Sequence, residues 1–205
     1  MDTSIFFATL GLGILCSFLG TLPLSTLNLS ILKLALSNQH REALLFTYSA
    51  TIVEFLQVCL ILPLLNILVT ITYLKTVLTL ISIPILIVLG YKSYKTAAPT
   101  EGGKVIRNDG FKQGLLLGLT NVMVYPFWLL WGHIFVSNGW LKIEFVSISF
   151  FCIGVGIGTL LSLLVFVYLG KILWQRLQYL QFYINRLIAF AFFSFAFLQL
   201  YAFIK

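Results

Sequence analysis

The sequence contains very little charge and few of the residues that bind metals or carry out redox chemistry. Only 9% of its 205 residues are Asp, Glu, Lys or Arg, and it has three Cys and two His. Hydrophobic residues make up 60% of the chain, and its mean hydropathy is +1.04. Apolar runs of about 18 residues or more are typical of membrane helices. Because such runs leave no room for a soluble domain, we predict an all-α integral membrane protein surrounded by the lipid bilayer.

Signatures of catalysis and of cofactor binding are also missing. Cys16, Cys59 and Cys152 lie in separate apolar segments without a CxxC spacing, so we expect small buried hydrophobic residues rather than a redox or metal site. Gly102-Gly103-Lys104 lacks the frame of a phosphate-binding loop. The 13 Lys and Arg form no clustered basic face, which argues against a nucleic-acid partner. We therefore expect no cofactor and no enzymatic activity.

The apolar segments predict six transmembrane helices in two halves. Their ranges are 5–36, 43–69, 73–94, 110–137, 145–169 and 187–204. A polar stretch at 96–109, with Gly and Pro, is predicted to be a cytoplasmic linker between three-helix halves at 1–95 and 110–205. The N-terminus lacks the basic region and cleavage site of a signal peptide, so we expect the first segment to remain as a helix.

The first segment contains the least regular stretch. A helix over 5–36 would be roughly 48 Å long, whereas the hydrocarbon core is about 30 Å thick. Pro23 removes a backbone hydrogen bond, and Ser25, Thr26 and Asn28 follow it. A polar break at membrane depth survives only inside protein or beside a water-filled cavity. We therefore expect this stretch to line a substrate path.

The fourth segment repeats this feature. Asn121 and Pro126 again interrupt an apolar run. Pro23 and Pro126 are 103 positions apart. Gly11 and Gly114 have the same separation, which is about half the chain. Interrupted helices at matching positions of two halves are typical of inverted-repeat transporters. We predict two inverted three-helix repeats, with helices 1 and 4 broken or kinked at Pro23 and Pro126.

The second segment carries a carboxylate at membrane depth. Glu54 and Gln57 lie three residues apart and so share a helix face. A carboxylate at the bilayer centre costs roughly 2.5–3.5 kcal/mol on insertion scales. Glu54 should therefore face the bundle interior, with either a functional or a purely structural, hydrogen-bonded role.

Two glycine patterns predict close helix packing. Gly110, Gly114 and Gly118 recur at four-residue spacing, and Gly154 and Gly158 form a GxxxG pair. Such faces serve equally well within one protomer or between two, so a homo-oligomer is an open alternative.

The basic residues favour one orientation. The loops after the first, third and fifth helices, together with the helix ends beside them, hold ten Lys and Arg, against three on the other side. By the positive-inside rule these loops are cytoplasmic and both termini lie outside. We expect a multi-pass protein of the plasma (inner) membrane.

Several short motifs resemble the LysE-type (lysine exporter, amino-acid translocator) family. Pro23-Leu24-Ser25-Thr26-Leu27-Asn28, followed by the basic turn at 38–43, is similar to the family's opening motif. Phe111-x-x-Gly114 and Leu119-Thr120-Asn121 resemble the start of its fourth helix, and Pro126-Phe127-Trp128 resembles an ending found in one branch. The family's glycine after the first proline is replaced by leucine in this chain.

The resemblance implies a small efflux protein that exports a metabolite, commonly an amino acid, by using an ion gradient. Half-helix ends near Pro23 and Pro126 would suit the carboxylate of such a substrate. Glu54 would hold its amino group or exchange a proton during alternating access. The candidate substrate-binding residues are Pro23, Ser25, Thr26, Asn28, Glu54, Gln57, Asn121, Pro126 and Trp128.

Three alternatives stay open. A divalent metal-ion exporter needs several oxygen ligands or His and Cys, for which Glu54 and His133 are the candidates. A thiol-relay membrane enzyme needs two cysteines that meet in the core. A non-transporting membrane scaffold needs no polar-lined broken helices.

Overall fold

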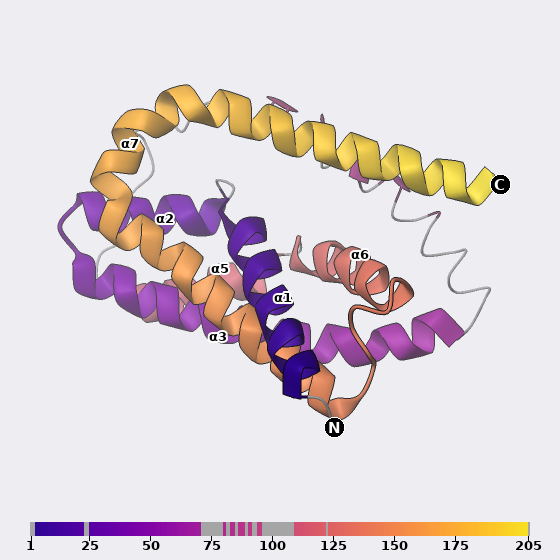
Figure 1. The fold of residues 1–205 in the computed structure, drawn as a ribbon. Helices are drawn as coiled ribbons and strands as arrows, with labels where there is room; N and C mark the ends of the chain where they lie inside the picture. Colours follow the sequence, from indigo (N-terminus) through magenta and orange to yellow (C-terminus); the bar gives the residue numbers. More distant parts are fainter. Residues whose placement is uncertain are drawn as a thin grey trace. The chain divides into compact units, whose positions relative to one another are not determined.

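The computed structural model describes residues 3–22, 25–70, 109–121 and 123–204, together with positions 80, 83–84, 86–88, 90–91 and 94–95. Secondary structure in these residues is helical throughout (Figure 1). The main helices are α1 (Thr3–Thr21), α2 (Thr26–Leu36), α3 (His40–Thr70), α5 (Gly110–Leu119), α6 (Val124–Ser137) and α7 (Phe145–Ile204). The chain forms two compact units, which comprise Met1–Leu65 with Glu101–Gln175, and Asn66–Thr100 with Arg176–Lys205.

Two helical stretches are long and apolar enough to cross a membrane alone, namely His40–Leu65 and Phe145–Gly170. Two bent helix pairs raise the number to four if each pair forms one span: α1 with α2, bent by 74°, and α5 with α6, bent by 60°. The described residues thus contain two to four candidate spans, as expected for a helical membrane protein. The predicted helix at 73–94 and the linker at 96–109 lie largely outside these residues, and the six-helix inverted repeat stays a prediction.

The break between α1 and α2 is held by side-chain hydrogen bonds. Ser25 has extended backbone and caps α2, because its hydroxyl accepts a 3.4 Å hydrogen bond from the amide of Asn28. The side-chain amide of Asn28 donates to the carbonyl of Thr21 at 2.6 Å. This carbonyl lies in the last turn of α1, where no intrahelical partner exists. Pro23 lies outside the described residues, so its kink stays a prediction.

The second break lies earlier than predicted. α5 ends at Leu119 and α6 begins at Val124, so Pro126 is the third residue of α6 rather than the break point. A proline in the first turn of a helix is well tolerated, because the amide it lacks has no carbonyl partner there. The break predicted at Pro126 is therefore corrected to 120–123.

α7 is continuous, whereas the sequence predicted two helices with a loop between 169 and 187. It has 60 residues, about three times the length needed to cross a bilayer. The segment from Lys171 to Arg186 contains neither proline nor glycine. Polar residues there interrupt the apolar pattern without interrupting the backbone hydrogen bonds, so the helix continues.

Both glycine faces pack as predicted, within the first unit. A methyl group on Gly114 of α5 would collide with the carbonyl of Phe46 on α3. Gly154 and Gly158 of α7 lie equally close to the backbone of α1, with Gly154 against the carbonyl of Leu10. The contacts of Gly154 and Gly158 account for the close crossing of α1 and the first part of α7 (Figure 1).

The second unit includes the last part of α7. Gly90 packs against the ring of Phe193. The guanidinium of Arg186 lies 5.6 Å from the ring centroid of Tyr94, within the range of a cation–π contact.

Candidate functional site

Glu54 lies at a convergence of four helices. It is partly buried near the middle of the candidate span of α3. Its carboxylate interacts with the side chains of Trp128 on α6 and Thr159 on α7, and the thiol of Cys16 on α1 experiences its charge. The predicted inward orientation is therefore present. An acid with polar neighbours on other helices is the arrangement that makes a carboxylate tolerable at membrane depth.

A pair of hydroxyls lies beside this polar cluster. The Oγ of Ser17 and the Oγ1 of Thr159 are 2.6 Å apart, and either can donate the hydrogen bond. Both residues are at most 1% exposed. The hydroxyls also link α1 to α7 beside Gly158, where an added Cβ would lie 3.0 Å from the Cβ of Ser17. Sequence reasoning missed both residues, because which hydroxyls meet depends on how α1 crosses α7.

Gln57 connects α3 to the second break. Its Nε2 lies 3.4 Å from the carbonyl of Gly118 on α5 and 3.5 Å from the hydroxyl of Tyr125 on α6, which are long hydrogen bonds. Its Oε1 is buried without a hydrogen-bond partner among the described residues. Gln57 thus offers an acceptor next to the end of α5.

Trp128 is fully buried and rigidly held. Its ring meets Phe127 and Phe151 edge to face, with centroids 5.1 Å and 5.7 Å away. In the part of the chain that the structure describes, the indole Nε1 has no hydrogen-bond partner, so its interaction with Glu54 lies outside hydrogen-bond geometry. A buried donor left unpaired costs about 1–3 kcal/mol, and a bound substrate or water would relieve that cost.

The two interrupted segments meet each other. Gly20, near the end of α1, lies against the ring of Phe127 on α6, and no side chain larger than hydrogen fits there without a shift. The first break and the start of α6 are therefore neighbours in the first unit.

The predicted site residues form two groups. Glu54, Gln57 and Trp128 are brought together between α3 and α6. Ser25 and Asn28 instead shape the first break, while Thr26 is exposed at the start of α2. Asn121 lies in the second break, where its backbone amide donates to the carbonyl of Gly118 at 3.1 Å, and Pro126 lies in the first turn of α6.

Two of the three cysteines lie close together, although the sequence places them in separate apolar segments. The thiols of Cys59 on α3 and Cys152 on α7 interact with each other, and all three cysteines are free. A thiol relay would need such a meeting of two cysteines. Among the described residues, no group of three or more His, Cys, Asp or Glu could hold a metal ion.

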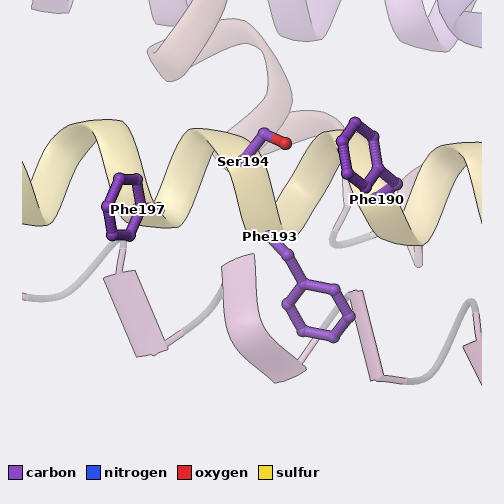
Figure 2. Close-up of a pocket in the computed structure, with 4 residues that line it drawn as sticks. All are labelled: Phe190, Phe193, Ser194 and Phe197. Atoms are coloured by element: carbon purple, nitrogen blue, oxygen red, sulfur yellow. The ribbon is translucent and has the colours of Figure 1, made fainter.

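A shallow pocket in the second unit has a different character. It is lined by Phe190, Phe193, Ser194 and Phe197 on α7 (Figure 2). Among the described residues, its lining consists of three phenylalanine rings and one serine hydroxyl. These side chains carry no charge to match an ammonium or a carboxylate, so the cluster around Glu54 is the better candidate for a metabolite site.

Comparison with known families agrees with the motifs. The family model described as LysE type translocator matches residues 18–202. The chain belongs to the LysE type translocator family. The resemblance drawn from its short motifs is thereby confirmed. No curated protein and no solved structure matches the chain. This LysE-type translocator is a multi-pass membrane protein that acts in export, and its family consists of translocators rather than enzymes.

Proposed function

We propose that this LysE-type translocator is a secondary-active exporter of an amino acid or a derivative, working by alternating access with proton coupling. The observation that carries the proposal is the position of Glu54, partly buried between α3, α6 and α7 beside the unpaired indole N–H of Trp128. A lone acid in this setting attracts either a proton or a substrate ammonium group, and the two compete for it.

The remaining polar groups suit the other parts of an amino acid. The buried Oε1 of Gln57 can accept a hydrogen bond from the substrate, and the Nε1 of Trp128 can donate one. The first turn of α6 begins at Val124 without a side-chain cap on its amides. Exposed amides at a helix N-terminus carry partial positive charge and favour a carboxylate.

In this mechanism, the half-helices move at the two helix breaks. The α1–α2 and α5–α6 junctions, bent by 74° and 60°, are places where half-helices can rotate, because the continuous helical hydrogen bonding is interrupted there. Alternating access then opens the space around Glu54 to one side of the membrane at a time. We place the protein in the plasma membrane, with the loops after helices 1, 3 and 5 cytoplasmic and both termini outside, on the basis of the positive-inside rule.

Counterflow in proteoliposomes tests this proposal. Vesicles containing the purified protein are loaded with an unlabelled amino acid, diluted into a trace of the same labelled compound, and assayed across a panel of amino acids. We expect transient accumulation of at least one amino acid above the level in empty vesicles. Absence of accumulation with every member of the panel, for protein that remains monodisperse, would reject the amino-acid substrate.

A further inference from the structure

Thr159 is in contact with two polar groups on two different helices. Its hydroxyl interacts with the carboxylate of Glu54 on α3 and is 2.6 Å from the hydroxyl of Ser17 on α1. A threonine hydroxyl has one proton to donate and two lone pairs with which to accept. It can therefore accept a proton from one neighbour while it donates its own to the other.

We propose that Thr159 and Ser17 form a hydroxyl relay that carries the coupling proton between Glu54 and water at the α1–α2 break. The relay deepens the proposed function, and it rests on the proton coupling stated there. It assigns a role in proton transfer to two residues that have no part in binding the substrate.

Each step of the relay conserves protons and charge. The protonated carboxyl of Glu54 gives its proton to the oxygen of Thr159, which passes its own proton to the oxygen of Ser17. Ser17 in turn releases a proton to water. Glu54 is left as a carboxylate, both hydroxyls are restored, and the water carries the charge away. Because either oxygen of the Ser17–Thr159 pair can donate, the same path also works in reverse.

The exit of the relay lies towards the first break. Ser17 precedes Thr21 by four residues, which places both on one face of α1. Thr21 is the last residue of α1. Its carbonyl accepts a hydrogen bond from the side-chain amide of Asn28 instead of from a backbone amide of the same helix. Non-helical backbone at membrane depth is tolerated inside protein or beside a water-filled cavity. In the relay we propose, water reaches this break, one helical turn from the end of the hydroxyl pair.

Few of the described groups that face Glu54 can take up its proton in place of Thr159. From α1, the thiol of Cys16 faces it. The neighbours from α6 and α7 are Trp128 and Thr159, neither of which becomes charged by titration at ordinary pH. On α3 itself, Gln57 is one turn away and carries no charge. In the described part of the chain, the hydroxyls of Thr159 and Ser17 link Glu54 to α1.

The test separates movement of substrate from movement of protons. Substrate exchange returns the carrier with substrate bound and needs no proton transfer, whereas accumulation driven by a pH gradient needs one in each cycle. Both are measured in proteoliposomes with a ¹⁴C-labelled mixture of the twenty protein amino acids. The variants are Thr159→Val, Thr159→Ser and, as the matched control, Thr47→Val. Thr47 is a fully buried threonine on α3, whose hydroxyl donates to the carbonyl of Ala43 in its own helix.

For Thr159→Val, we expect exchange within twofold of wild type but at least a tenfold loss of gradient-driven accumulation. Thr159→Ser and Thr47→Val should each keep both activities within threefold. The relay is rejected if Thr159→Val retains gradient-driven accumulation, or if it loses exchange and accumulation together. If the wild-type protein exchanges amino acids but ignores the pH gradient, proton coupling fails and the relay fails with it. If the wild-type protein exchanges none, the substrate assignment itself is wrong.

Discussion

The side-chain amide of Asn28 donates a 2.6 Å hydrogen bond to the carbonyl of Thr21, across the break between α1 and α2. Asn28 is fully buried, and its backbone amide is held by the hydroxyl of Ser25. One side chain thus joins the end of one half-helix to the beginning of the next. The polar residues that marked this stretch in the sequence therefore have a structural role, beside any contact with substrate.

Replacing Asn28 with leucine should destabilise the protein. The substitution keeps a side chain of similar size but leaves the carbonyl of Thr21 unpaired, which costs about 1–3 kcal/mol. The thermal midpoint in detergent should fall by several degrees. Ser30→Ala is the control, because the hydroxyl of Ser30 bonds the Thr26 carbonyl within its own helix. An unchanged midpoint for Asn28→Leu would show that the hydrogen bond contributes nothing to stability.

Replacing Gly114 with alanine should also destabilise the fold. The added methyl group would overlap the carbonyl of Phe46, a backbone atom that cannot move aside cheaply. Overpacking of this kind costs typically about 1–3 kcal/mol. Gly11→Ala provides the matched control, since a methyl group there meets nothing within 4 Å. Thermal unfolding of both variants in the same detergent measures the difference, and equal midpoints would contradict the α3–α5 contact.

The sequence predicted those features of the fold that local patterns determine. Hydropathy located α3, and the Gly110–Gly118 spacing predicted a packing face that does lie against α3. Proline predicted the position of the second break less well, because Pro126 lies in the first turn of α6 and the break precedes it. Polarity alone also suggested a loop inside α7, although the segment from Lys171 to Arg186 contains neither proline nor glycine.

The part of the candidate site that depends on a local sequence pattern could also be predicted. A carboxylate in an apolar run must turn inward, so Glu54 was evident from its own helix. Ser17 and Thr159 were not, because single hydroxyls are common in membrane helices and their partner is set by a crossing of helices distant in sequence. The meeting of Cys59 with Cys152 has the same origin.

Replacing Trp128 with phenylalanine should weaken substrate binding more than it weakens the fold. The ring contacts with Phe127 and Phe151 are largely kept, while the unpaired Nε1 donor is removed. A hydrogen bond to a charged group contributes about 1.5–3 kcal/mol, so the KM for transport should rise by about ten- to a hundredfold. Trp140→Phe is the control, because Trp140 is 60% exposed outside the helices. If both variants have the wild-type KM, the indole N–H does not contact substrate.

The start of α5 should respond to acid through Asp109. Hydrogen bonds from the side chain and backbone of Lys112 hold the pKa of Asp109 below its ordinary value. Because the folded-state pKa is lowered, the stabilisation is complete above about pH 4 and is lost as pH falls through the lowered value. Hydrogen-exchange protection of the first amides of α5, corrected for intrinsic rates, should decrease in that range. Asp109→Asn, which does not titrate, should abolish the change, and a persistent change would assign it to another group.

The central claim, that Glu54 couples export to protons, is tested most directly by Glu54→Gln in proteoliposomes. The measured quantity is the rate of labelled amino-acid movement with and without an imposed pH gradient. Glu144→Gln serves as the matched control, because Glu144 is exposed just before α7. We predict that Glu54→Gln removes the response to the gradient while Glu144→Gln keeps it. Full, pH-dependent transport by Glu54→Gln would contradict the account.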